Sequence, residues 1–190
     1  MSRFNSLLPV DRVRDLTYMS TQAQIIKLEA SGTLVRYMPR VSRPPKRRLF
    51  LGPDAQKDLG DPTSATNVLV GKAYIVAALD RWVLGEKVYG KKRGEFLDRL
   101  KPPPPDVWEI RVTPPSVQAR LFGRFAEPDT LILTKFHTRS MLGDKGSHGW
   151  NQAMAHCDQS WTTMFPGISC FTHKDDVRAY VTENCDAYPI

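Results

Sequence analysis

Arginine side chains occupy alternate positions in two neighbouring segments near the middle of the chain. Arg111 stands in VWEIRV, and Arg120 and Arg124 stand in VQARLFGRF. A period of two places the apolar side chains of a strand on one face and the others on the opposite face. We therefore expect the three arginines to share the polar face of one antiparallel sheet. Guanidinium groups on a rigid sheet suit bidentate contacts with phosphate, so nucleic acid is the first partner to consider.

The next segment, TLILTKFHTRS, adds Lys135, His137 and Arg139 at alternate positions. Regular extension would place them on one face with Leu131 and Leu133. RNA cleavage without a metal ion requires a base for the 2′-OH proton, cations for the charge that builds on phosphate, and an acid for the leaving oxygen. Histidine can serve either proton-transfer role near neutral pH, and lysine or arginine can stabilise the charge. The predicted catalytic residues are Arg111, Arg120, Lys135, His137 and Arg139.

A structural explanation of the same cations stays open. Glu109 and Glu127 lie in the same segments. Carboxylates on the sheet face would pair with the arginines, which would then hold the sheet together instead of binding a ligand.

The formal net charge of +7 is unevenly distributed along the 190 residues. Residues 1–105 carry 19 Lys/Arg and 10 Asp/Glu, whereas residues 106–190 carry 8 and 10. Strong local basicity favours polyanion partners through counterion release, although a solvated loop would have the same composition. The predicted nucleic-acid contacts lie around a Pro-Pro pair, in a second basic cluster and on one strand: Arg40, Arg43, Lys46, Arg47, Arg48, Lys91, Lys92, Arg93 and Arg124.

The sequence gives no sign of a membrane segment, a metal site or a cofactor. No stretch approaches the roughly 20 apolar residues of a membrane helix, and the N-terminus lacks the apolar segment of a secretory signal. Cys157, Cys170 and Cys185 are odd in number and widely spaced, which favours reduced thiols in a cytoplasmic protein. Cys170 and His173 have metal-ligand spacing but no second pair. We therefore expect a cytoplasmic protein with no cofactor, no metal and no membrane partner.

A small sheet flanked by helices would position the candidate residues. We expect helices over 21–30, 67–84, 95–100, 148–164 and 172–184, and strands over 33–38, 48–51 and three segments between 105 and 139. This order predicts an α+β fold in which a small antiparallel sheet, a three-strand meander plus one or two N-terminal strands, packs against helices, with two helices at the C-terminus. We expect one globular unit with an N-terminal extension (1–45), a core (46–140) and a C-terminal helical extension (141–190) packed on the core.

The meander resembles the core of RelE/HigB-type toxins, a group that includes phage-derived relatives. In that family a helix leads into a W-E-L-R strand, then a y-R-v-f-y strand, then a strand that ends in L-h-x-F-x-K-K. The resemblance covers about 40 of the 190 residues, and Thr138 stands where the family has one of the two lysines. The residues that match are Trp108, Glu109, Arg111, Arg120, Leu133, Phe136 and Arg139.

The resemblance implies a compact sheet flanked by helices and a metal-independent endoribonuclease that cleaves mRNA, usually on translating ribosomes. It also implies an antitoxin protein as inhibitor, and catalysis by basic residues at positions such as Arg111, Arg120 and Arg139. The alternative is a non-enzymatic binder that uses the same basic sheet on nucleic acid or on an acidic protein, as a gyrase-directed relative or a phage-encoded inhibitor would. A structural phage component is a third alternative.

Overall fold

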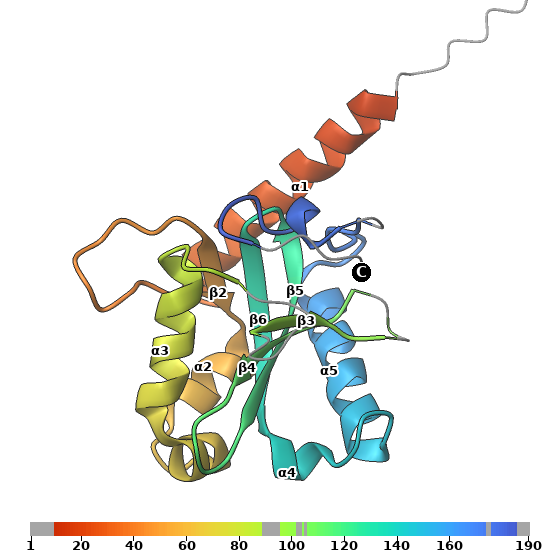
Figure 1. The fold of residues 1–190 in the computed structure, drawn as a ribbon. Helices are drawn as coiled ribbons and strands as arrows, with labels where there is room; N and C mark the ends of the chain where they lie inside the picture. Colours follow the sequence, from red (N-terminus) through yellow and green to blue (C-terminus); the bar gives the residue numbers. More distant parts are fainter. Residues whose placement is uncertain (1–9, 89–95, 102–103, 105, 174–175, 186–190) are drawn as a thin grey trace, which may run out of the picture.

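The computed structural model describes residues 10–88, 96–101, 104, 106–173 and 176–185, with side chains from residue 20 onward. Within these residues six strands form one sheet, which confirms the predicted α+β class. The strands are β1 (Val35–Arg36), β2 (Arg48–Leu51), β3 (Leu97–Arg99), β4 (Trp108–Val112), β5 (Ala119–Glu127) and β6 (Thr130–Thr138). Their order across the sheet is β1-β2-β6-β5-β4-β3 (Figure 1). The predicted meander is present as β4–β5–β6, but the prediction of a purely antiparallel sheet is wrong because β2 runs parallel to β6.

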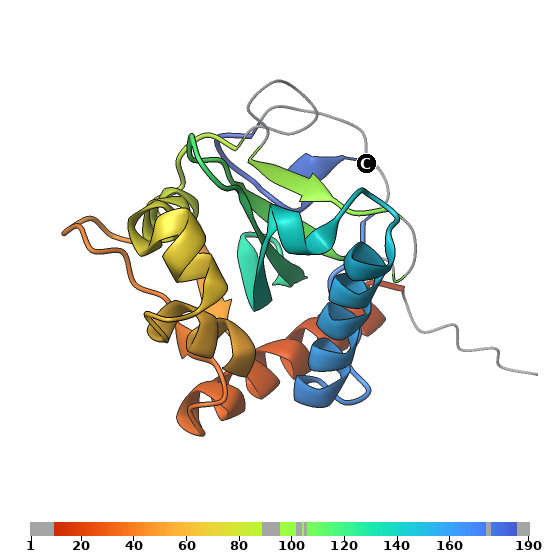
Figure 2. The ribbon, with the colours of Figure 1, turned by 90° about the horizontal axis from the view of Figure 1, so that it is seen from below.

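Helices cover both faces of the sheet. They are α1 (Val10–Ala30), α2 (Pro53–Gly60), α3 (Lys72–Val83), α4 (Arg139–Leu142) and α5 (His148–Met164), with a π-helical turn at Asn67–Gly71 and a 3-10 turn at Val177–Ala179. The views in Figures 1 and 2 place α3 and α5 on opposite sides of the sheet, and the C-terminal half of α1 packs on the α5 side. None of the described helices is long and apolar enough to cross a membrane.

Alternation along β4 and β5 decides which side chains meet which helix. Trp108 and Phe125 point toward α3, where they share the largest core cluster with Trp82. Phe122 points to the other face and packs against Trp150 of α5. The face that carries the arginines is therefore the face that α5 covers, and it is not an open surface.

A β-bulge interrupts β6 at Thr134. On β5, Phe122 pairs with Lys135 and Gly123 pairs with Leu133, so Thr134 is the extra residue. A Cβ atom on Gly123 would lie 2.4 Å from the carbonyl oxygen of Ile132, which explains why glycine stands opposite the bulge.

The bulge changes which β6 side chains share a face. Leu131 and Leu133 belong to the core cluster on the α3 side, and so does Phe136. His137 is the Cα partner of Arg120, on the α5 side. The prediction that Lys135 and His137 share a face with Leu131 and Leu133 is therefore wrong, because regular extension does not persist through Thr134.

Helix α2 lies along the part of β6 that β2 does not reach. Strand β2 pairs with β6 only as far as Leu133. Beyond that point, the Asp58 carboxylate accepts hydrogen bonds from the backbone N–H of Phe136 at 3.0 Å and from Nζ of Lys135 at 2.9 Å. The Asp58 carboxylate thus accepts the backbone hydrogen bond that a neighbouring strand would otherwise accept.

The helix predicted over 95–100 is wrong, because Leu97–Arg99 forms β3 and pairs antiparallel with β4. Leu97 packs in the core on the α3 side, whereas Leu100 packs with α5. The apolar side chains of this short segment point to both faces of the sheet, and such a pattern fits an edge strand as well as a helix.

The second C-terminal helix, predicted over 172–184, is also wrong. The described residues there form turns and the single 3-10 turn at Val177–Ala179. The Thr172 hydroxyl donates a hydrogen bond to Asp106 at 2.8 Å instead of capping a helix. The ring of Tyr180 lies 4.7 Å from that of Trp108, so this segment packs as an irregular strap into the core.

Other predicted elements agree to varying degrees. The strand over 48–51 and the helix over 148–164 are confirmed at the predicted bounds. The helix predicted over 21–30 begins earlier, at Val10, and the strand predicted over 33–38 contains only β1. In the helix predicted over 67–84, a π-helical turn precedes α3.

Candidate functional site

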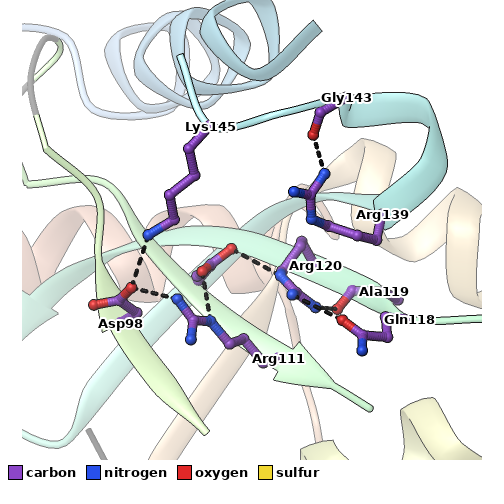
Figure 3. Close-up of polar contacts among 9 residues, drawn as sticks. Asp98, Arg111, Gln118, Ala119, Arg120, Arg139, Gly143 and Lys145 are labelled. Carbon is purple, nitrogen blue, oxygen red and sulfur yellow. Dashed lines mark hydrogen bonds and ion pairs between the residues drawn. The ribbon is translucent and has the colours of Figure 1, made fainter. Parts of the chain in front are cut away.

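Four cations gather with two carboxylates on the α5 face, at one end of the meander (Figure 3). We call this group the cation cluster. Its members come from five segments: Asp98 of β3, Glu109 and Arg111 of β4, Arg120 of β5, Arg139 at the start of α4, and Lys145 between α4 and α5. Three of the five predicted catalytic residues, Arg111, Arg120 and Arg139, are therefore brought together.

The register of the sheet creates this arrangement. Arg111 is the Cα partner of Arg120, and Glu109 is the Cα partner of Asp98. Paired residues of antiparallel strands share a face, and positions two apart on one strand share it as well. Two arginines and two carboxylates from three strands therefore lie side by side.

Glu109 is the buried centre of the cluster, with none of its surface exposed. Its Oε1 accepts a hydrogen bond from Nε of Arg111 at 2.7 Å, and its Oε2 lies 3.3 Å from Nε of Arg120. Burial raises the pKa of the Glu109 carboxyl, while the charge and hydrogen bond of Arg111 and the charge of Arg120 oppose that shift. The carboxylate therefore fixes two guanidinium groups in place.

Two further N–H groups of Arg120 form hydrogen bonds within the protein. Its guanidinium donates to the carbonyl of Ala119 at 2.9 Å and to the side-chain oxygen of Gln118 at 3.1 Å. Burial lowers the pKa of Arg120, and Glu109 opposes that effect. Arg120 is thus the buried arginine of the cluster, and its position is fixed by Glu109, Ala119 and Gln118.

The outer layer consists of Arg139, Lys145 and one side of Arg111. The Arg139 guanidinium lies 5.2 Å from the ring centre of Trp150 and donates to the carbonyl of Gly143. Asp98 pairs with Arg111 and, at 3.2 Å, with Lys145, whose side chain is 60% exposed. Counted over the described residues, the four cations of the cluster exceed its two carboxylates by two charges. An anion from solvent would first contact the more exposed cations of the cluster.

His137 and Lys135, the other two predicted catalytic residues, lie beside the cluster, on the same face. His137 is half-buried, with its ring edge-on to Phe122 and 5.6 Å from it. Its buried Nε2 has no hydrogen-bond partner among the described residues. Burial, followed by the charge of Lys135, lowers the pKa of His137 to about 4, so the imidazole is neutral at pH 7. Lys135 itself pairs with Asp58 at 2.9 Å.

Arg124 lies on the predicted face but apart from the cluster. Its side chain is buried under α5 and pairs with Asp158 at 2.7 Å. The structural explanation applies here, because this arginine links β5 to α5.

The basic segment before β2 divides into buried and exposed residues. Arg47 is buried against the ring of Trp82 and donates to the carbonyls of Glu86 and Glu183. Arg48 pairs with the buried Glu127. These two predicted nucleic-acid contacts are internal links, whereas Arg40, Arg43 and Lys46 are exposed. Lys91, Lys92 and Arg93 lie outside the described residues.

Sequence reasoning missed Asp98 and Lys145. The helix predicted over 95–100 does not bring Asp98 to the arginines, whereas a strand assignment would place it opposite Glu109. Lys145 lies in the turn GDKGS, and no local signal shows that this turn folds back over β3.

Within the described ranges, no three His, Cys, Asp or Glu side chains are grouped so that they could hold a metal ion. Comparisons with protein-family models, with curated proteins and with solved structures find no match for this chain. The resemblance to RelE/HigB-type toxins therefore stays a prediction, and the cation cluster is the basis for a functional proposal.

Proposed function

We propose that the cation cluster holds a phosphate of the RNA backbone and that the protein is a metal-independent endoribonuclease of the RelE-like type that cleaves mRNA. One observation carries the proposal: Arg111, Arg120 and Lys145 converge from separate segments on Glu109 and Asp98, and Arg139 lies beside them, so that among the described residues the cations of the cluster outnumber its carboxylates. Such a fixed, half-buried excess of cations suits a phosphodiester better than a neutral ligand.

In the proposed reaction, the 2′-oxygen attacks phosphorus and the bond to the 5′-oxygen breaks. Arg139 and Lys145 contact the phosphate from the outer layer, and Arg111 stabilises the charge that builds on it. His137 is neutral at pH 7, which is the protonation state that a base for the 2′-OH requires. The ammonium of Lys145 gives a proton to the leaving oxygen. The products are a 2′,3′-cyclic phosphate and a free 5′-OH end.

The test uses the full chain with end-labelled single-stranded RNA in EDTA, and in parallel with mRNA in a translation extract. We expect discrete products with cyclic phosphate ends, and a loss of about 100-fold in rate for Arg139→Ala. Lys57→Ala, which removes an exposed lysine of α2 outside the cluster, should cleave at the wild-type rate. Intact RNA under both conditions would rule out the nuclease.

The second candidate is a non-enzymatic binder of RNA phosphate. It is favoured by the buried Nε2 of His137, because burial reduces the access of the proposed base to a substrate, and by the ion pair that engages Lys135, a predicted catalytic residue. In that case RNA would bind and stay intact, and Arg139→Ala would weaken the binding. The cleavage assay and a binding assay together separate the two functions.

A further inference from the structure

An apolar groove runs between the edge of the sheet at β1 and the helices α2 and α3, far along the sheet from the cation cluster. It has a volume of about 370 Å³. Its walls come from the strand and the residues after it on one side and from the two helices on the other: Val35, Tyr37, Met38, Arg40, Leu51, Gln56, Leu59, Gly60, Lys72 and Val76. We call it the β1 groove.

Exposed aliphatic side chains line the β1 groove. Val35 is 45% exposed and Met38 is 56% exposed. Apolar side chains that gather at a concave surface with a polar rim are typical of a site where a partner binds. Methionine in particular adapts its shape to different apolar partners.

The charges of the groove are of one sign. Arg40 and Lys72 line it, and none of its lining residues is a carboxylate. The hydroxyl of Tyr37 donates to Asp80 at 2.7 Å, and the amide of Gln56 donates to the carbonyls of Thr33 and Leu51. The hydroxyl of Tyr37 and the amide N–H groups of Gln56 thus already donate hydrogen bonds within the protein. Arg40 and Lys72 are the charged side chains of the lining that an incoming ligand can contact.

The position of the groove favours an extended segment. β1 is the last strand of the sheet on this side, and among the described residues no strand pairs with its outer edge. Peptides commonly bind in extended form beside such edges, with alternate side chains in neighbouring pockets.

We propose that the β1 groove binds a short acidic segment of a partner protein. An aliphatic side chain of that segment packs between Met38 and Leu59, and flanking carboxylates pair with Arg40 and Lys72. This proposal does not depend on the proposed function, because the groove shares no residue with the cation cluster.

Other occupants fit the groove less well. A second copy of this chain would bring Arg40 and Lys72 of the two copies toward each other. The first ten residues of the chain, MSRFNSLLPV, contain an arginine and no Asp or Glu, so they do not complement the groove. Single-stranded RNA is bound mainly by stacking on aromatic side chains, and Tyr37 is the one aromatic residue of the lining.

The experiment titrates the isotope-labelled full chain with a ten-residue peptide of alternating Glu and Leu and records amide and methyl shifts. We expect saturable shifts at Val35, Met38 and Leu59. The double variant Arg40→Glu/Lys72→Glu should bind at least tenfold more weakly. Lys101→Glu, which reverses an exposed charge outside the groove, should bind as the wild type does. Circular dichroism checks that the variants stay folded.

Three results would overturn the proposal: no shifts at the groove, equal binding of a Lys/Leu peptide, or displacement of the Glu/Leu peptide by a ten-nucleotide RNA. A dimer of the free chain that dissociates in the double variant would assign the groove to a second copy instead. Activity in the RNA assay is a separate readout, so loss of the nuclease proposal leaves this test unaffected.

Discussion

Glu109 determines how the arginines of the site are held. It is fully buried and contacts both Arg111 and Arg120. A buried carboxylate between two guanidinium groups is costly to desolvate, so the interaction contributes little net stability as long as all three groups are present. Removal of this negative charge leaves the buried Arg120 without its carboxylate partner and takes one of the carboxylates away from Arg111, which still pairs with Asp98.

We therefore expect Glu109→Gln to destabilise the fold by about 3 kcal/mol, as measured by urea unfolding at pH 7. Glutamine has nearly the same shape as glutamate, so the decrease in the free energy of unfolding measures the effect of removing the charge. Glu86→Gln is the matched control, because Glu86 pairs with Arg43 at 3.9 Å between exposed side chains. That pair should contribute less than about 1 kcal/mol. Equal losses in the two variants would contradict the assigned role of Glu109.

His137 should make stability depend on pH. Its pKa of about 4 lies below the ordinary value of 6.5, so between these values the unfolded chain binds more protons than the folded one. The contribution of the neutral His137 to the free energy of unfolding is therefore fully present above pH 6.5 and is lost as the pH falls toward 4. The loss at pH 5 should be about 2 kcal/mol relative to pH 7.5. Urea unfolding of His137→Gln at both values should lack this part of the pH dependence, and an unchanged dependence would refute the assignment.

Part of the site could be predicted from single residues. Alternation correctly placed Arg111 and Arg120 on one face, because the period of a strand is a local property. Burial was not predictable in this way, since α5 covers that face from 25 or more residues further along the chain. The pairing of Arg124 with Asp158 of α5 and of Lys135 with Asp58 of α2 depends on helices that are distant in sequence.

At the scale of the element, the bulge in β6 places two predicted catalytic residues, Lys135 and His137, on the same face as the arginines. Without Thr134 as an extra residue, Lys135 and His137 would share a face with Leu133 and enter the core on the α3 side. Gly123 permits the bulge, because the carbonyl of Ile132 takes the space of a Cβ atom.

Gly123→Ala should therefore destabilise the protein by about 2 kcal/mol, because the methyl group clashes with backbone that cannot easily move. Thermal unfolding followed by circular dichroism measures the loss. Gly60→Ala is the control: it lies at the end of α2, with nothing within 4 Å of an added Cβ atom. It should be neutral or slightly stabilising. A neutral Gly123→Ala would mean that the bulge moves freely.

Elements with several periodic residues were predictable, and short or irregular ones were not. The apolar stripe of α5 and the nine-residue strands β5 and β6 each repeat their pattern often enough to identify the element. β3 has three residues, which fit a helix and a strand equally. Thr172 followed by Asp175 has the spacing of a capping box, but Thr172 bonds to Asp106, which is distant in sequence.

At the scale of the whole molecule, the C-terminal strap belongs to the same core as the sheet. Val177, Tyr180 and Val181 are fully buried in the cluster that contains Trp82 and Trp108. The hydroxyl of Tyr180 also donates to the carbonyl of His173 at 2.9 Å. The division into a core at 46–140 and an extension at 141–190 stays a prediction, but these contacts make independent unfolding of the two parts unfavourable.

Tyr180→Ala should destabilise the protein by about 4 kcal/mol through the cavity that it leaves among aromatic rings. Unfolding should stay a single transition in which tryptophan fluorescence and far-UV circular dichroism coincide. Met141→Ala, at an exposed position of the predicted extension, should have almost no effect. Two separated transitions in the wild type would show that the strap and the sheet are separate cooperative units.

The distribution of charge over the molecule predicts how RNA binding responds to salt. The net charge of +7 attracts any polyanion, but Arg47, Arg48 and Arg124 are engaged in internal pairs, so the total charge overstates the number of phosphate contacts.

If the cation cluster and two or three further exposed cations contact phosphates, the logarithm of the binding constant should fall with that of salt concentration with a slope of about −3 to −4. Arg139→Ala should reduce the magnitude of the slope by about 0.7, the value for one contact with a single strand, whereas Lys57→Ala should leave it unchanged. Fluorescence anisotropy with a labelled single-stranded RNA between 50 and 300 mM KCl, roughly the range where such contacts dominate affinity, measures both slopes. Equal effects of the two substitutions would mean that RNA is attracted by the overall charge and not held at the cluster.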